Sequence, residues 1–265
     1  MTMTTQQTLP AAFSTQLRVI HAVVARELLT RYGRNNIGFL WVFVEPMIFT
    51  LAIAWLWSVL KTGSMPGVSV VAFAITGYTS VLLWRNAATR CTQAMQTNWA
   101  LMYHRAVTPL DLYLARILIE VCAATTSLAV MAAIFIAIGQ MSFPQDPFRA
   151  VCAWFLLVGF AYGFAMVVGA LASMSESFER IWHLLTYLLF PVSGAMFMVA
   201  WLPEPMREVV LALPMVHGVE MLRGAWFGSA VTSYENVPYL MLSIGVLVAL
   251  GLLLIQKAGR RVEPN

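Results

Sequence analysis

The chain has 265 residues, a formal net charge of +4, 60% hydrophobic residues and only 11% charged residues. Soluble domains contain roughly 45–50% apolar and about 25% charged residues. With so little charge the chain could not cover a globule of its size with polar surface, which excludes a soluble enzyme, a disordered tail and a nucleic-acid-binding module. The mean hydropathy of +0.76 and the 9 Trp and 15 Phe residues indicate an all-α polytopic membrane protein.

An N-terminal segment, residues 14–35, precedes the first apolar run and has an amphipathic pattern. Its apolar residues recur at helical spacing and are Leu17, Ile20, Val24 and Leu28. A helix with such a stripe can lie on a membrane surface, so we expect an interfacial helix on the cytoplasmic leaflet. The same stripe would also suit a helix that packs on the side of a membrane bundle.

Six apolar segments are long enough to cross a bilayer core of about 30 Å as helices. They are residues 39–60, 68–84, 117–139, 151–172, 181–202 and 238–255. Backbone groups in lipid must be satisfied internally, and these runs are too long and too uniformly apolar for barrel strands. If the N-terminus is inside, 12 of the 16 Lys and Arg residues flank the cytoplasmic ends of the spans. This bias predicts a multi-pass protein with both termini in the cytoplasm.

Residues 98–112, between the second and third spans, are expected to form a cytoplasmic segment. Thr108-Pro109 interrupts its helical pattern, and Asp111 could cap the helix that follows. A short amphipathic helix in such a loop would suit the groove of a partner protein, and a solvated connector is the alternative. Arg116 and Glu120 then open the third span at a spacing of four, which predicts an ion pair within that helix.

Residues 203–228 lie outside, between the fifth and sixth spans. Their apolar stretch at residues 209–219 contains Pro214 and is too short to span, and runs of about this length are interfacial or re-entrant. We therefore expect a re-entrant periplasmic hairpin. Glu220 and Arg223 follow at a spacing of three and could form a buried ion pair.

The chain lacks the motifs that bind a nucleotide phosphate or a catalytic zinc ion, and it lacks the motif of a nucleophilic serine elbow. Its 4 histidines are scattered, and its 3 cysteines lie far apart without metal-ligand spacing. We therefore expect no catalytic site and no bound metal. A membrane-embedded transferase or hydrolase, the rival of a different class, would have to use Glu45, Glu120 or His183.

Glu45 lies about one helical turn inside the first span, next to Pro46, which should kink the helix. A carboxylate at membrane depth is costly and usually faces protein or a wet cavity. Glu45 could therefore sit at the cytoplasmic interface, paired with Arg31 or Arg34, or it could lie on the wall of a translocation path.

Aromatic residues are dense in the first and fifth spans. Such side chains can pack against lipid and the protein core, anchor helix ends at the interface, or stack on the apolar faces of sugar rings. They are Phe39, Trp41, Phe43, Phe49, Trp55 and Trp57 in the first span, and Tyr187, Phe190, Phe197 and Trp201 in the fifth.

Three motifs follow one another along the chain. They are Arg31-Tyr-Gly-Arg-Asn-Asn-Ile-Gly-Phe-Leu-Trp-Val-Phe-Val-Glu-Pro46, Phe190-Pro-Val-Ser-Gly-Ala-Met-Phe197 and Leu213-Pro-Met-Val-His-Gly-Val-Glu-Met-Leu-Arg223. Their order and spacing resemble those of type-2 ABC exporter permeases over nearly the whole chain. The third is similar to a segment of the capsular polysaccharide export (KpsM-type) branch. Two departures, Leu213 in place of asparagine and Asn35-Asn36 in place of a small hydroxyl region, bear on the exact substrate.

The resemblance implies a homodimer of six-span subunits in the inner membrane of a Gram-negative cell. Two cytoplasmic ATP-binding subunits would join it and use ATP and Mg, while this chain would bind no cofactor and no nucleic acid. The implied activity is export of a lipid-anchored, usually acidic polysaccharide to periplasmic and outer-membrane export proteins. Permeases for O-antigen, teichoic-type glycans or small molecules are the nearest alternatives, and a scaffold subunit without transport is a further class.

The resemblance also implies roles for particular residues. The first and fifth spans would line the substrate path, where Arg31 and Arg34 could bind an anionic glycolipid headgroup. Residues 98–112 and the N-terminal helix would contact the ATP-binding subunits, and residues 203–228 would form a periplasmic gate. The candidates are Arg31, Arg34, Phe39, Trp41, Glu45, Tyr187, Phe190, Phe197 and Trp201 for the path; Leu101, Met102, Tyr103, His104, Arg105, Thr108, Pro109 and Asp111 for the coupling; and His217, Glu220 and Arg223 for the gate.

Overall fold

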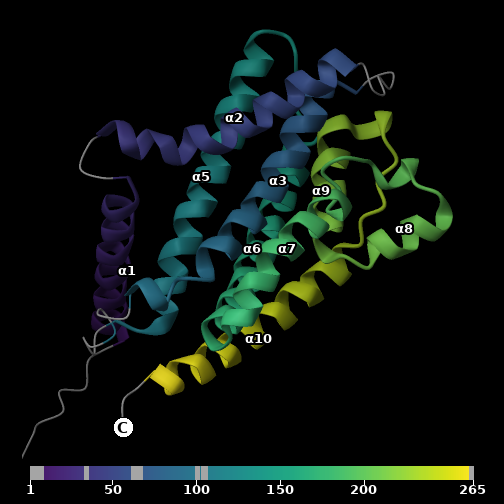
Figure 1. Ribbon diagram of the computed structural model, residues 1–265. Helices are drawn as coiled ribbons and strands as arrows, with labels where there is room; N and C mark the ends of the chain where they lie inside the picture. Colours follow the sequence, from purple (N-terminus) through teal and green to yellow (C-terminus); the bar gives the residue numbers. More distant parts are fainter. Residues whose placement is uncertain (1–8, 33–35, 61–67, 99–101, 103–106, 263–265) are drawn as a thin grey trace, which may run out of the picture.

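The computed structural model describes residues 9–32, 36–60, 68–98, 102 and 107–262 (Figure 1). These residues form helices and short connections, and none of them lies in a strand, which confirms the all-α class. The helices are α1 (Leu9–Tyr32), α2 (Asn36–Leu60), α3 (Val70–Cys91), η1 (Gln96–Asn98), α5 (Pro109–Ala137), α6 (Pro147–Met174), α7 (Glu176–Val192), η2 (Val199–Trp201), α8 (Glu204–Leu211), α9 (Pro214–Phe227), η3 (Gly228–Ala230) and α10 (Val237–Val262).

Helix α3 occupies the centre of the bundle, where it packs against α2, α5, α6, α7 and α9 (Figure 1). Most of its side chains are buried, including those of Thr76, Thr79 and Ser80. Each of these hydroxyls donates to the backbone carbonyl one turn earlier, which satisfies it within the helix. Because protein surrounds α3, this helix can carry polar residues that a lipid-facing span could not.

Three of the described helices are long and apolar enough to cross a membrane, namely α5, α6 and the stretch Val237–Arg260 of α10. They overlap the spans predicted at residues 117–139, 151–172 and 238–255. Helices α2 and α3 overlap the predicted first two spans, at residues 39–60 and 68–84. The total of six crossings stays a prediction.

The span expected at residues 181–202 is not one helix. Helix α7 ends at Val192 after 17 residues, a rise of about 25 Å. The chain then turns at Gly194, whose φ of +86° suits a residue without a Cβ and ends helices. The Ser193 hydroxyl donates to the Phe190 carbonyl at this stop. The prediction of a single helix was wrong because it followed hydropathy, which stays high across Ser193-Gly194. The backbone conformation at Gly194 nevertheless ends the helix.

Helix α1 packs along α5. Val23 is buried together with Leu112 and Ala115 of α5. Leu28 packs against Ile119 and Ala123, which also lie on α5. Leu17, although apolar, is exposed. The predicted amphipathic helix at residues 14–35 therefore begins earlier, at Leu9, and uses its apolar stripe at least partly against the bundle. Its place on the membrane surface stays a prediction.

The bundle has two distinct ends. At the α1 end, where α5 and α7 begin and α3 finishes, Gln16 of α1 donates to the Asp111 carboxylate of α5. At the α8 end, where α6 and α10 begin, the Asp146 N–H donates to the Ala225 carbonyl of α9 at 3.0 Å. Polar side chains concentrate at both ends, and they define the two parts of the candidate site.

Candidate functional site

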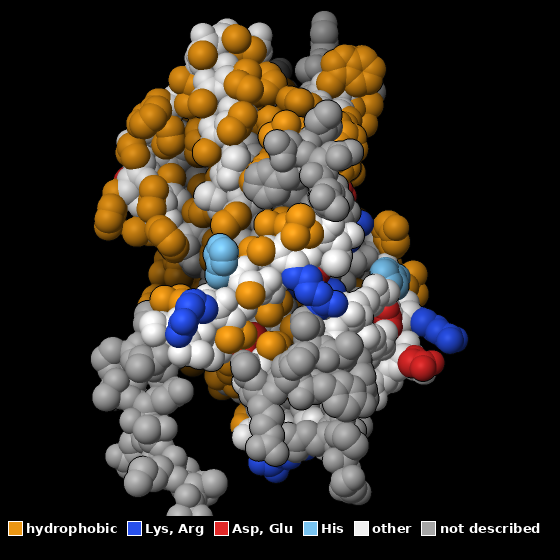
Figure 2. All heavy atoms as spheres, turned by 90° about the vertical axis from the view of Figure 1, so that its left-hand side faces the viewer, with side chains coloured by type: hydrophobic (Ala, Val, Ile, Leu, Met, Phe, Trp, Pro, Cys, Tyr) orange, Lys and Arg blue, Asp and Glu red, His pale blue; other side chains and the backbone are white. Residues whose placement is uncertain are grey.

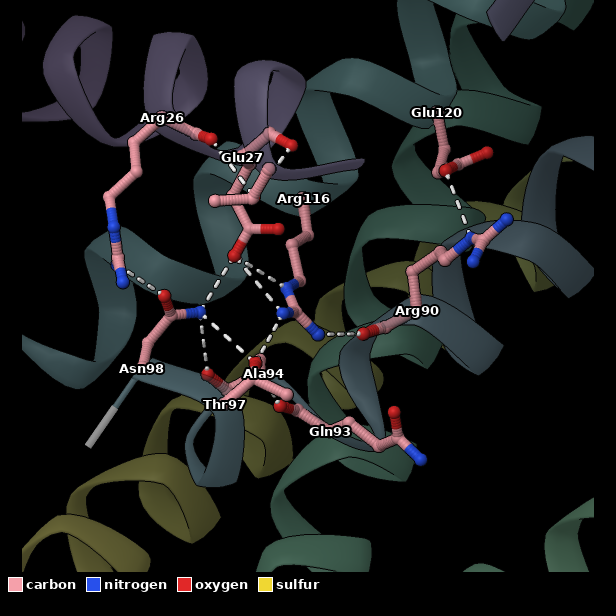
Figure 3. A network of polar contacts seen from close by, with 10 residues as sticks. Arg26, Glu27, Arg90, Gln93, Ala94, Thr97, Asn98, Arg116 and Glu120 are labelled. Carbon is pink, nitrogen blue, oxygen red and sulfur yellow. Dashed lines mark hydrogen bonds and ion pairs between the residues drawn. The ribbon is translucent and has the colours of Figure 1, made fainter. Parts of the chain in front are cut away.

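A polar network joins α1, η1 and α5 at the α1 end (Figure 3). Asn98 Nδ2 donates to Glu27 Oε1 at 2.7 Å, and Arg26 Nη1 donates to Asn98 Oδ1 at 2.6 Å. Arg116 donates to the same Glu27 oxygen from Nε at 3.1 Å and from Nη2 at 3.0 Å. One carboxylate of α1 therefore holds both the η1 segment and the guanidinium of α5.

The predicted ion pair between Arg116 and Glu120 is wrong. Arg116 pairs with Glu27, and these side chains are only 12% and 14% exposed. Arg116 Nη1 also donates to the Arg90 carbonyl of α3 at 2.6 Å, while Glu120 Oε1 lies 3.5 Å from Arg90 Nε. Buried charges must be matched by whichever opposite charges the packing places beside them, and here those charges come from other helices.

These side chains line a polar cavity of about 470 Å³. Its lining includes Arg26, Arg90 and Arg116 together with Glu27 and Glu120. Viewed from the side of α1, charged and histidine side chains form a band below a mostly hydrophobic upper part (Figure 2). Because cations and carboxylates pair within the cavity, this arrangement is suited to holding helix ends together.

The predicted coupling segment, residues 98–112, overlaps the start of α5. The Asp111 N–H donates to Thr108 Oγ1 at 3.4 Å, and the Thr108 N–H donates to Asp111 Oδ2 at 2.8 Å. Thr108 is therefore the cap, and Asp111, predicted as the cap, completes a capping box from the third helical position. Pro109 occupies the first position, and Met102 packs against the cluster around Val23. The remaining candidates, Leu101, Tyr103, His104 and Arg105, lie outside the described residues.

At the α8 side, α9 carries the three predicted gate residues, of which Arg223 is the most buried, with no exposed surface. Arg223 Nη1 donates to the carbonyls of Gly194 at 2.5 Å and Phe197 at 2.6 Å. Nη2 donates to those of Ala195 at 2.7 Å and Phe73 at 3.3 Å. Three of these carbonyls belong to the non-helical segment after α7. Arg223 thus satisfies buried backbone acceptors that the end of α7 leaves without helical partners.

Glu220 binds the backbone as well. Its carboxylate accepts the Val199 N–H at 3.1 Å and the Tyr234 N–H at 3.2 Å. Among the described side chains, Glu220 and Arg223 do not approach within ion-pair distance, so the predicted pair is wrong. Spacing on one helix placed them near each other, but buried backbone groups of the neighbouring segments take up both side chains.

His217 extends this pattern to the start of α10. The Asn236 N–H donates to His217 Nδ1 at 3.1 Å. Because Nδ1 accepts this bond, the ring proton is on Nε2, which donates to the Leu211 carbonyl at 2.8 Å. The three predicted gate residues therefore do lie together on α9, but each binds backbone outside α9. Their combined effect is to fix the segments that enter and leave the helix pair α8 and α9.

Helix α9 reaches deep into the bundle from the α8 end. Pro214 at its start shares an apolar cavity of about 370 Å³ with Phe160 and Phe164, in the middle of α6. Near its other end, the Trp226 indole N–H donates to the Ser142 carbonyl in the connection before α6 at 2.9 Å. The expected segment at residues 203–228 thus consists of two short helices, one of which covers about half the length of α6.

The predicted path residues divide into two groups. Tyr187, 69% exposed, and Phe190 lie on α7, where the Phe190 ring is 6.3 Å from the Phe49 ring and 5.5 Å from the Tyr78 ring. This aromatic cluster joins α2, α3 and α7. Trp41, like Glu45, is exposed on α2.

The second group lies beyond the end of α7. Trp201 stacks on Phe73 with ring centroids 5.2 Å apart, and Phe197 contributes a carbonyl to Arg223. The break in α7 separates these two residues from Tyr187 and Phe190, with which the sequence had grouped them. The side chains of Arg31, Arg34 and Phe39 lie outside the described residues.

Glu27, Asn98 and Arg90 were not predicted as site residues from the sequence. Glu27 is 89 positions from Arg116, so no local spacing joins them. The available signal was weaker: Arg90 flanks an apolar segment and was counted only as a topological charge, while Arg116 was assigned to Glu120 on its own helix. Asn98 lay at the edge of the coupling segment and drew no attention as a single polar residue.

Comparisons with known proteins identify the family to which the chain belongs. The model of the ABC-2 type transporter family matches residues 18–227. The capsule polysaccharide export inner-membrane protein CtrC of Neisseria meningitidis serogroup B is 45% identical over 94% of each chain. The corresponding BexB of Haemophilus influenzae is 38% identical over 98% of each chain. The polysialic acid transport protein KpsM of Escherichia coli is 24% identical over 92% of this chain and 95% of its own. This chain belongs to the ABC-2 type transporter family.

Proposed function

We propose that this chain is the transmembrane subunit of an exporter of capsular polysaccharide, powered by separate ATP-binding subunits. The identity of 38–45% to capsule polysaccharide export inner-membrane proteins, over nearly the whole chain, carries the proposal. Family membership supports the ATP-binding partner, which would use ATP and Mg, whereas this chain would hold no cofactor. The relative named for polysialic acid supports an acidic polymer as the substrate.

In this proposal two copies pair in the bacterial inner membrane, and two ATP-binding subunits dock at the α1 end in the cytoplasm. Helices α2, α3, α5, α6, α7 and α10 would supply six crossings, with the segment after α7 completing the fifth. Helices α8 and α9 would form a re-entrant periplasmic hairpin. The Arg and Lys bias supports this orientation. The lipid-anchored polymer would pass on to periplasmic and outer-membrane export proteins.

The polar network at the α1 end would transmit the motion of the ATP-binding subunits. A force on residues 98–112 reaches Asn98 first, and from there Glu27 on α1 and Arg116 on α5. Because one Glu27 oxygen receives bonds from both partners, α1 and the start of α5 would move with the segment as one body.

The substrate path would run along the exposed aromatic faces of α2 and α7, after Arg31 and Arg34 attract the anionic headgroup. Rings such as Tyr187 and Trp41 can contact the apolar faces of sugars without the strong, site-specific hydrogen bonds that would stop a polymer from sliding. At the outer end, His217, Glu220 and Arg223 would hold the gate segments in place during passage.

Deletion of the gene and its restoration on a plasmid test the proposal. We expect deletion to remove capsule from the cell surface, measured with an antibody against the polymer, and to leave polymer inside the cell. The purified chain should hydrolyse ATP only together with its ATP-binding subunits. Loss of O-antigen with intact capsule would favour the alternative substrate, and ATP hydrolysis by the chain alone would contradict the assigned role.

A further inference from the structure

Arg85, which the Lys and Arg bias placed at the cytoplasmic end of the predicted second span, instead lies within α3, because this helix continues to Cys91. Arginine inside a membrane helix is costly. The ring of the neighbouring Trp84 is 5.7 Å from the ring of Phe164, which lies well inside α6, a helix apolar enough to cross the membrane. Arg85 is half-buried. An ionisable side chain at membrane depth usually marks a functional site and has an identifiable partner.

The other arginines of α3, α5, α6 and α9 have such partners among the described residues. Arg90, Arg116 and Arg149 pair with Glu120, Glu27 and Glu235, and Arg223 binds four carbonyls. The contacts of Arg85 are of another kind. Its guanidinium carbon lies 5.7 Å from the ring centroid of Tyr187 and 5.7 Å from that of Phe190. No carboxylate of the described chain pairs with it.

This cluster opens outward. Tyr187 is 69% exposed, and Leu184 and Leu188 beside it on α7 are 62% and 61% exposed. Arg85 contacts ring faces, which attract a cation but take up none of its N–H groups. The N–H groups therefore stay available to an acceptor that approaches along the exposed side of α7.

We propose that Arg85, together with Tyr187 and Phe190, forms a subsite that binds a carboxylated sugar unit of the polymer. The two rings contact the apolar face of the sugar, and the guanidinium forms charge-assisted hydrogen bonds with the carboxylate. A neutral glycan gains only the ring contacts. The subsite thus selects acidic polymers, an inference that rests on the proposed function and names its specificity-determining residue.

The test uses the complete complex of this chain and its ATP-binding subunits in phosphatidylcholine nanodiscs. The probes are a tetramer of sialic acid and the neutral maltotetraose, titrated against intrinsic tryptophan fluorescence. Arg85→Met keeps the apolar stem and removes the charge, Arg85→Lys keeps the charge, and Arg180→Met removes an exposed charge from the start of α7 as the control.

We expect Arg85→Met to weaken binding of the acidic tetramer about tenfold or more, the worth of a charge-assisted hydrogen bond, and to leave maltotetraose binding unchanged. Arg85→Lys should restore part of the preference, and Arg180→Met should keep all of it. Equal affinity of wild type and Arg85→Met for the acidic tetramer would overturn the inference. The inference would also be overturned if the wild type bound the acidic tetramer no more tightly than maltotetraose. This measurement does not depend on the folding of any variant.

Two further measurements distinguish a sugar carboxylate from a lipid phosphate as the bound anion, and failure of the subsite from failure of the proposed function. If Arg85 instead binds a lipid phosphate, Arg85→Met will lower the amount of co-purified phosphatidylglycerol without changing affinity for the acidic tetramer, and the inference falls. If cells keep their capsule after deletion of the gene, the proposed function is contradicted. If deletion removes the capsule but Arg85→Met exports it at the wild-type rate, only the subsite is contradicted.

Discussion

The two ends of the bundle bury arginine in different ways. At the α1 end, Arg116 pairs with a carboxylate on another helix and shares it with Asn98. On the α8 side, Arg223 binds four backbone carbonyls and leaves carboxylates aside. A side-chain pair can break and re-form when helices move, but backbone carbonyls are fixed by the fold. The first arrangement therefore suits a joint that transmits motion, and the second suits a permanent brace.

Arg223→Met removes the brace and should destabilise the protein most. Several buried carbonyls lose their donor at once, so we expect a loss on the order of 4 kcal/mol in the free energy of unfolding. Thermal unfolding of the purified complex measures it. An unfolding midpoint equal to that of wild type would show that the segment after α7 does not depend on this side chain.

Gly77→Ala disturbs the same brace by adding a methyl group to α3 beside Arg223. A Cβ at this position would lie 2.2 Å from Arg223 Nη2 and 2.7 Å from the Ala195 carbonyl oxygen. We expect a destabilisation of about 2–3 kcal/mol, because overpacking displaces the guanidinium from its carbonyls. The matched control is Gly245→Ala on α10, where a Cβ meets nothing within 4 Å. The control should be neutral or more stable by less than about 1 kcal/mol, and a similar loss in both variants would contradict the account.

Glu27→Gln weakens the joint at the α1 end and should reduce stability less than the two changes at the brace. The amide oxygen still accepts hydrogen bonds while the ionic attraction to Arg116 is lost, so we expect a destabilisation of about 1–2 kcal/mol. The complex should assemble and hydrolyse ATP, but export per ATP should fall. Parallel assays of ATP hydrolysis and surface capsule measure the ratio, and an unchanged ratio would remove Glu27 from the coupling route.

Some of this was readable from local sequence. Composition predicts the membrane class, Thr108-Pro109 predicts an interruption between helical segments, and the short apolar run around Pro214 predicts a segment that does not span. Each of these is a property of neighbouring residues, and the backbone obeys them locally. The stop at Ser193-Gly194 was readable in principle, but the hydropathy of the surrounding residues concealed it.

Local sequence therefore predicts an all-helical membrane chain of the permease type and the position of most of its helices. Tertiary packing selects the partner of each buried charge: Glu27 rather than Glu120 for Arg116, and backbone rather than Glu220 for Arg223. It alone also placed Arg85 over the rings of α7. The physical reason is that periodicity and hydropathy reflect neighbouring residues, whereas a buried charge is matched by whatever the packing of distant helices brings within reach.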